Sequence, residues 1–155
     1  MAKEKLRLRV ATPECVKYDG DAEMIIMRCI TGDMGILPKH EPCSTVLDYG
    51  ILRIVDEGSE RRMAVFGGIA QVLNNQVTVL ANDAQWPEDI DIAMAEAERD
   101  NTARRLQEDV DILEIQKDQI RMRRSLVQIE VSSYPLLSRI EQPAESGETA
   151  SDGSE

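Results

Sequence analysis

Few residues in this sequence have the types and spacing that enzyme chemistry requires. His40 is the only histidine, and no serine or cysteine stands in a nucleophile-elbow motif. No glycine-rich loop ends in the Gly-Lys-Ser or Gly-Lys-Thr of a phosphate-binding P-loop. The many carboxylates gather in the second half of the chain, where such runs usually form a solvated helix face. We therefore expect a non-catalytic protein that holds no cofactor.

Metal chemistry is not indicated either. Cys15, Cys29 and Cys43 lie far apart and lack the short paired spacing of a zinc site or a redox pair. Cysteines of this kind usually behave as small apolar residues. We expect all three to be buried and no metal to be bound.

The charge of the chain excludes some partners. Its 155 residues carry a formal net charge of −11, whereas nucleic acids and anionic membranes require a cationic surface. No apolar run is long enough to cross a bilayer, and the first residues lead into an alternating strand pattern instead of a signal-peptide core. These features predict a cytosolic protein without a transmembrane segment.

Residues 32–42 combine glycine and proline with apolar side chains, which is unusual for a loop without a role. The apolar residues of this stretch are Met34, Ile36 and Leu37. One interpretation is a turn and an edge strand whose apolar side chains face the core. The other is a loop that contacts a partner.

A basic cluster stands out in the acidic second half of the chain. Its members are Lys117, Arg121, Arg123 and Arg124. The cluster could be a solvated helix face that pairs with Glu114 and Asp118 one turn away. Alternatively, it could be a docking site for an acidic partner surface.

The first half of the chain has the pattern of an all-β unit. Apolar residues alternate with polar ones in short runs separated by turn residues, which is typical of a sandwich or flattened barrel. The expected strands are residues 5–10, 15–18, 24–27, 43–47, 51–55, 61–66, 69–73 and 77–81. The trio Asp19-Gly20-Asp21 predicts a turn, and Gly67-Gly68 predicts a bend or bulge.

The hydrophobic period changes from two to about three and a half residues within residues 76–106, as expected where a last strand leads into a helix. Residues 92–106 form an alanine-lined helix, which we expect to be weakly anchored because alanine buries little apolar surface. A break at residues 108–111 precedes a second, more apolar helix, so the pattern predicts a hairpin. The expected division is a β-sandwich over residues 1–86, an antiparallel helical hairpin over 87–134 and a disordered acidic tail over 135–155.

Several stretches in order along the chain resemble the epsilon subunit of bacterial F-type ATP synthases. The similar stretches are residues 6–14, 32–42, 67–68, 77–81 and 88–91, and the match is collinear over about residues 5–130. The resemblance implies an N-terminal β-sandwich of about ten strands followed by a C-terminal helical hairpin. It also implies a non-catalytic subunit of the central stalk, placed peripherally on the cytoplasmic face of the bacterial plasma membrane.

The resemblance further implies partners and contact residues. The sandwich would join the gamma subunit to the membrane c-ring, with Asp33, Met34 and His40 as ring contacts. The hairpin would extend into the alpha/beta catalytic head and restrain ATP hydrolysis. Its contacts with the head would be Lys117, Arg121, Arg123 and Arg124.

One motif departs from the family pattern. Family members that bind ATP on the folded hairpin carry Ile/Leu-Asp-x-x-Arg-Ala at the start of the first helix. The corresponding residues here are Ile90, Asp91, Met94 and Ala95, so Met94 replaces the arginine. Because methionine offers no cation for phosphate, we expect no ATP binding at this motif.

Two other functions are compatible with the sequence. The chain could be a purely structural stalk subunit whose hairpin stays folded and inhibits nothing. It could also be a free-standing β-sandwich that binds a regulatory ligand and dimerises through its helices.

Overall fold

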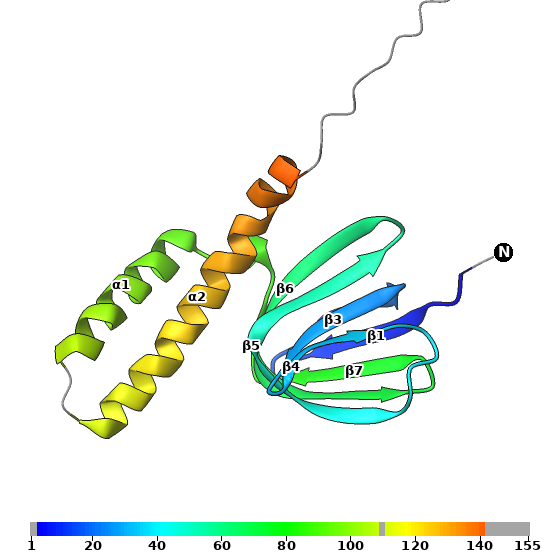
Figure 1. Ribbon diagram of the computed structural model, residues 1–155, viewed down its shortest axis with the longest axis horizontal. Coiled ribbons are helices and arrows are strands. Elements are labelled where there is room, and N and C mark those ends of the chain that lie inside the picture. Colours follow the sequence, from blue (N-terminus) through cyan, green and yellow to red (C-terminus); the bar gives the residue numbers. More distant parts are fainter. Residues whose placement is uncertain (1–2, 109–110, 142–155) are drawn as a thin grey trace, which may run out of the picture.

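The first half of the chain forms eight strands and the second half two helices in the computed structural model, which describes residues 3–108 and 111–141 (Figure 1). The strands are β1 (Leu6–Ala11), β2 (Val16–Ala22), β3 (Met24–Cys29), β4 (Gly32–Ile36), β5 (Cys43–Asp56), β6 (Ser59–Leu73), β7 (Gln76–Ala81) and β8 (Ala84–Gln85). Hydrogen bonds join them in the order β2-β1-β7-β6-β5-β3-β4, and β8 pairs with β6. This arrangement confirms the expected β-sandwich followed by a helical hairpin.

β5 and β6 are long, and each covers two of the strands that the sequence predicted. The β5–β6 ladder is interrupted between the pairs Leu47–Gly68 and Tyr49–Phe66. Gly67 has a φ of 75° at this point, a left-handed conformation that glycine adopts without steric cost. The predicted bend is therefore confirmed. It lies within two continuous strands, β5 and β6, which replace the four shorter strands that the sequence predicted.

The interior of the sandwich is one aliphatic cluster. Alternate residues of the strands point inward, as in β1, where Leu6, Leu8 and Val10 are buried and the two arginines between them are exposed. At the edge of the sheet, β4 buries Ile36 and packs Met34 against the same cluster. This outcome confirms the edge-strand interpretation of residues 32–42 for Met34 and Ile36, whereas Leu37, which follows the strand, is 57% exposed and does not face the core.

Two local expectations are wrong. The trio Asp19-Gly20-Asp21 is not a turn, because β2 continues through it to Ala22. Arg7 on the neighbouring strand bonds Asp19 at 2.9 Å and Asp21 at 3.4 Å, which offsets the low strand preference of these residues. Cys15 is exposed, whereas Cys29 is buried and Cys43 partly so, because Cys15 lies just before the outermost strand, where no element covers it.

The hairpin follows a short 3-10 turn, η1 (Pro87–Asp89), and consists of α1 (Ile92–Glu108) and α2 (Ile112–Glu141). Aspartates cap both helices. The backbone N–H of Met94 donates to Asp91 Oδ1 at 3.1 Å, and that of Leu113 donates to Asp111 Oδ1 at 3.0 Å. α2 continues through Pro135 to Glu141, beyond the expected end of the hairpin, and the remainder of the expected tail, residues 142–155, lies outside the described residues.

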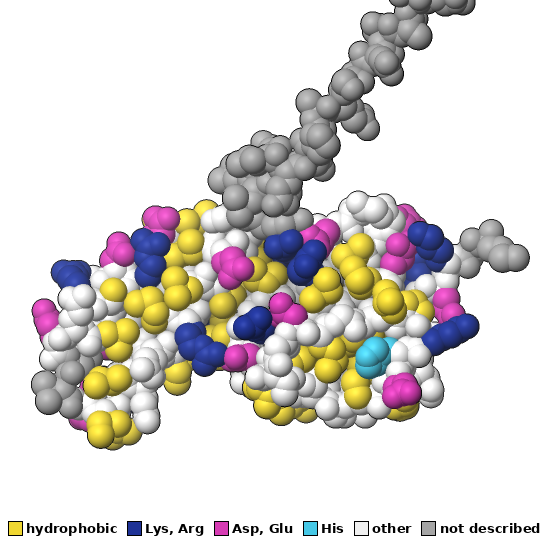
Figure 2. Space-filling model, in the orientation of Figure 1, with side chains coloured by type: hydrophobic (Ala, Val, Ile, Leu, Met, Phe, Trp, Pro, Cys, Tyr) yellow, Lys and Arg dark blue, Asp and Glu magenta, His cyan; other side chains and the backbone are white. Residues whose placement is uncertain are grey.

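α2 connects the hairpin to the sandwich, and α1 lies on the outer side of α2 (Figure 1). The contact is a small second cluster of buried residues, made by Ala64 and Phe66 of β6 with Val127 and Val131 of α2. Hydrophobic side chains remain exposed over both units (Figure 2). Among the described residues, neither helix is apolar enough over a sufficient length to span a membrane.

Candidate functional site

Two adjacent arginines of α2 bond to carboxylates of the sandwich. Arg123 Nη2 lies 2.6 Å from Asp48 Oδ1, at the bend of β5. Arg124 Nη2 lies 2.6 Å from Asp83 Oδ2, in the segment between β7 and β8. The side chains of Arg124 and Asp83 are 36% and 39% exposed, so water still reaches this pair. These ion pairs join elements that are far apart in the sequence.

Each of these arginines also covers an aromatic ring. The guanidinium of Arg123 lies 5.6 Å from the centre of the Tyr49 ring, and that of Arg124 lies 4.1 Å from the centre of the Phe66 ring. The two rings contact each other edge to face, with their centres 5.7 Å apart. The two arginines therefore make the same kind of contact twice, with one carboxylate and one ring for each.

The other two members of the basic cluster pair within the hairpin. Lys117 Nζ lies 3.2 Å from Glu114 Oε1, and Arg121 Nη1 lies 2.8 Å from Asp118 Oδ1. Both pairs are three residues apart on one helix. The expected pairing with Glu114 and Asp118 is thus confirmed for Lys117 and Arg121, but the face is solvated only at the first pair, because Asp118 is buried.

Asp118 is the buried centre of the seam between the two helices, with a side chain only 1% exposed. Its second oxygen lies 3.4 Å from Arg105 Nε on α1, so one carboxylate faces arginines from both helices. The hydrogen bond from Arg121 to Asp118 raises the pKa of the Arg121 guanidinium above its usual range. Thr102 and Ser125 are also buried, which makes the seam polar at this level.

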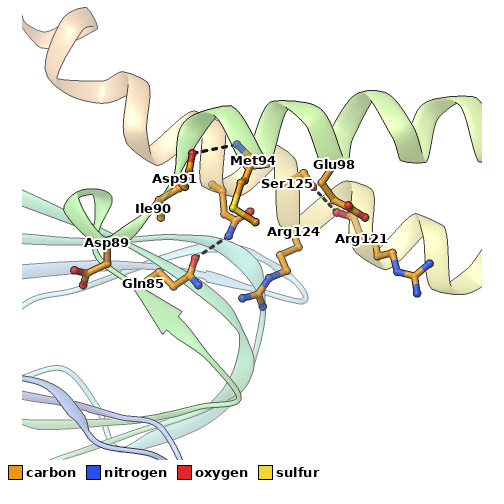
Figure 3. A pocket seen from close by; sticks show the side chains of 11 residues that line it. Gln85, Asp89, Ile90, Asp91, Met94, Glu98, Arg121, Arg124 and Ser125 are labelled. Atoms are coloured by element: carbon orange, nitrogen blue, oxygen red, sulfur yellow. Dashed lines mark hydrogen bonds between the residues drawn. The ribbon is translucent and has the colours of Figure 1, made fainter.

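A cavity of about 410 Å³ lies where the start of α1, α2 and the end of the sandwich meet (Figure 3). Its lining includes all four residues of the degenerate motif, Ile90, Asp91, Met94 and Ala95. Two arginines of the basic cluster, Arg121 and Arg124, line it as well. Figure 3 shows Arg124 pointing from α2 toward the strands and Arg121 pointing away from them.

The charges around this cavity do not fit a nucleoside triphosphate. Three carboxylates line it, those of Asp89, Asp91 and Glu98, against two guanidiniums. Both guanidiniums already have carboxylate partners, and Asp91 already accepts a backbone N–H at the start of α1. Met94, with 70% of its surface exposed, adds no cation. A polyanion would therefore meet repulsion here.

The three residues expected to meet a ring do not form one cluster. Asp33 projects into solvent from β4, and its Oδ1 lies 3.2 Å from Arg28 Nη1 on β3. Met34, the next residue, points the other way and packs against the sandwich interior. His40 lies beyond the far end of β4, where its Nδ1 is 2.8 Å from the carbonyl oxygen of Glu41. Since a strand rises about 3.3 Å per residue, Asp33 and His40 lie at opposite ends of this segment.

Comparison with known proteins places the chain in a family. A sequence profile described as "ATP synthase, Delta/Epsilon chain, beta-sandwich domain" matches residues 5–87. An ATP synthase epsilon chain of Brevibacillus brevis is 45% identical over 105 residues, which cover 67% of this chain and 80% of that one. The chain belongs to the ATP synthase epsilon family. An epsilon chain of Alkalihalophilus pseudofirmus is 41% identical over 101 residues, covering 65% of this chain and 76% of that one.

The fold of this epsilon-family chain also has a close match among solved structures. A chain in the cryo-EM structure of the Euglena gracilis mitochondrial ATP synthase, which contains OSCP, F1 and the c-ring, aligns with a TM-score of 0.73. The alignment covers 85% of this chain and 81% of that one at 21% identity. At that identity the likeness shows the fold, and it extends beyond the sandwich into the hairpin, because residues 5–87 are only about half of the chain.

The sequence did not predict the partners of Arg123 and Arg124 in the sandwich, Asp48 and Asp83. Asp48 and Asp83 stand 75 and 41 residues from the arginines that they bind. Asp48 lies in a trio of turn residues and Asp83 in a breaker run, so both carboxylates had a local explanation. No short-range pattern connects either of them to α2.

Proposed function

We propose that this epsilon-family chain is a non-catalytic rotor subunit of an F-type ATP synthase. In this role the sandwich joins the c-ring to the gamma subunit and carries proton-driven rotation toward the alpha/beta catalytic head. Family membership supports the proposal, and so does the similarity of the fold to a chain in an assembly that contains F1 and the c-ring. The protein would be peripheral to the cytoplasmic face of the bacterial plasma membrane, held there by its partners.

The ring contacts are proposed from the placement of the three expected residues. Asp33 offers an exposed carboxylate beside Arg28, a pair that polar or basic ring residues could join. His40 offers a half-buried imidazole at the other end of the segment. Met34 contributes indirectly, because its packing fixes the strand that carries Asp33.

The hairpin is proposed to restrain ATP hydrolysis by leaving the sandwich and meeting an acidic surface of the catalytic head. The observation that carries this proposal is the way α2 is held. A cluster of four buried residues with three partly buried neighbours, one hydrogen bond from Gln128 to Gln85 and two partly exposed ion pairs join it to the sandwich. Exposed ion pairs each contribute only about 0.2 to 1 kcal/mol, so they break readily. Lys117, Arg121, Arg123 and Arg124 are the proposed contacts with the head.

The test compares the full chain with a chain ending at Asp89 in the ATPase assay of the matching catalytic subcomplex. The truncated chain keeps Trp86, which packs against the sandwich interior and donates from Nε1 to the carbonyl oxygen of Lys17 at 3.2 Å. Circular dichroism confirms that the truncated sandwich is folded, and co-purification with gamma confirms that it binds. We expect the full chain to slow hydrolysis and the truncated chain to leave it unchanged.

The other outcomes separate the parts of the proposal. If both chains bind gamma and neither changes the rate, the subunit couples rotation without inhibiting, and the regulatory part is wrong. If neither chain binds gamma, the stalk role itself is wrong.

A further inference from the structure

We propose that Asp48 and Asp83 form a latch that holds the hairpin on the sandwich by occupying Arg123 and Arg124. An acidic partner must then displace these two carboxylates before it can bind the same arginines. The latch rests on the proposed inhibitory function for its biological role, but it can be measured without the catalytic head.

The geometry of the latch is specific. Arg123 and Arg124 are consecutive residues of α2, yet their carboxylate partners come from two separate places in the sandwich. Both aspartates are also oriented by their own backbone, because the N–H groups of Tyr49 and Ala84 donate to Asp48 Oδ1 at 2.8 Å and Asp83 Oδ1 at 2.9 Å. The acceptors are therefore in position before the helix docks, which reduces the entropy cost of each pair.

Because of the latch, Arg123 and Arg124 cannot contact the sandwich and an acidic partner at the same time. In the docked state each guanidinium is shared between one carboxylate and the face of one aromatic ring. A partner surface must offer at least two carboxylates to replace Asp48 and Asp83. A ring or an apolar residue beside each carboxylate would replace the contact with Tyr49 or Phe66. Asp48 and Asp83 thus act as an internal competitor that resembles the acidic surface to which the hairpin would bind.

The latch can be measured through a thiol placed under α2. Val131 is fully buried between α2 and the sandwich, so Val131→Cys reacts with a maleimide only when the helix leaves. Cys29 is buried in the sandwich interior and reports opening of the sandwich in the same molecule. Peptide mass spectrometry of the labelled full-length protein then gives the labelling rate at each of these two positions, separately from the exposed Cys15 and the partly buried Cys43.

The test variant is Asp48→Asn with Asp83→Asn. Asparagine keeps the shape and the oxygen that accepts the backbone N–H, and it removes only the charge. We expect the thiol at position 131 to be labelled about tenfold faster, because two exposed ion pairs are lost, while labelling of Cys29 stays unchanged. Raising the salt concentration should accelerate labelling of the parent chain and have little effect on the double variant.

A matched control is available on β2, which takes no part in the apolar cluster or the ion pairs that hold α2. Asp19 and Asp21 form exposed pairs with Arg7 and do not contact the hairpin. Asp19→Asn with Asp21→Asn changes the net charge by the same amount and should leave labelling at position 131 unchanged. If the two double variants label at the same rate, the latch is wrong.

The ATPase assay separates the latch from the proposed function. With the catalytic subcomplex, we expect Asp48→Asn with Asp83→Asn to inhibit at lower concentration than the parent chain. If labelling accelerates but neither chain inhibits, the latch is correct and the inhibitory function is wrong. If labelling does not change while the parent chain still inhibits, the function is correct and the latch is wrong.

Discussion

The bend of β6 gives a quantitative prediction about stability, because a side chain at Gly68 would meet backbone atoms, whereas a side chain at Gly35 or Gly58 would not. Gly68 has a φ of 135°, and a Cβ built on it would overlap the carbonyl oxygen of Leu80 and lie 2.8 Å from the Cα of Ala81. Both of these atoms belong to the backbone of β7 and cannot rotate away. Gly68→Ala must therefore strain its own backbone and push two paired strands apart.

The expected cost follows from these two effects. A side chain in this backbone region costs about 1 to 3 kcal/mol, and forcing extra volume against fixed atoms costs a further 1 to 3 kcal/mol. We expect Gly68→Ala to lower the free energy of unfolding by about 4 kcal/mol. Gly58 has a φ of 75° with no atom within 4 Å of its added Cβ, so Gly58→Ala should cost only about 1 kcal/mol.

Urea unfolding followed by circular dichroism measures the free energy of unfolding of both variants. Gly35→Ala serves as the control. Gly35 has no positive φ and no atom within 4 Å of an added Cβ, so its substitution should change stability by less than about 0.5 kcal/mol. The urea midpoint of unfolding should be highest for Gly35→Ala, lower for Gly58→Ala and lowest for Gly68→Ala. Equal losses for the two positive-φ glycines would refute the argument from contact with β7.

Three further predictions concern the hairpin and its connection to the sandwich. Asp118→Asn leaves Arg105 without its buried carboxylate partner, and we expect it to destabilise the packing of α1 on α2 by about 1 to 2 kcal/mol. Hydrogen exchange should become faster in both helices and should not change in the sandwich. Trp86→Phe removes the hydrogen bond to the carbonyl oxygen of Lys17 and should cost about 1 kcal/mol in urea unfolding; no loss would mean that water replaces the bond. Met94→Arg adds a cation to the cavity lining and should produce ATP binding that calorimetry detects, whereas the parent chain should give no signal; the absence of a signal from the variant as well would show that Met94 is not the determinant.

The sequence was sufficient for features that depend on neighbours along the chain. The alternation in β1 and the change of period before α1 predicted a sandwich followed by a hairpin. Gly67-Gly68 predicted the bend because two consecutive glycines allow positive φ values at a strand junction. The acidic residues before α2 predicted a helix start, and Asp111 caps it.

The contacts that depend on the fold were not predictable in this way. Asp19-Gly20-Asp21 has the composition of a turn, but Arg7 on the adjacent strand holds it extended. The partners of Arg123 and Arg124 are visible only once the bend of β5 and the segment after β7 are brought to the same side of the sandwich. Local sequence describes the elements, whereas the sandwich topology decides which charges meet.

The distribution of polar and apolar residues in the hairpin favours the proposed exchange of its closed form for another. The seam between α1 and α2 buries the polar side chains of Thr102 and Asp118, while large apolar residues such as Ile112 and Leu113 are 73% and 64% exposed. A hairpin stabilised chiefly by its own packing would have the opposite arrangement, with its largest apolar side chains in the seam. A second surface that covers these exposed residues would compensate for the ion pairs of Asp118 that are lost when the helices separate. The same reasoning applies to the contact with the sandwich, where four buried residues with three partly buried neighbours, one hydrogen bond and two partly exposed ion pairs hold a helix of 30 residues.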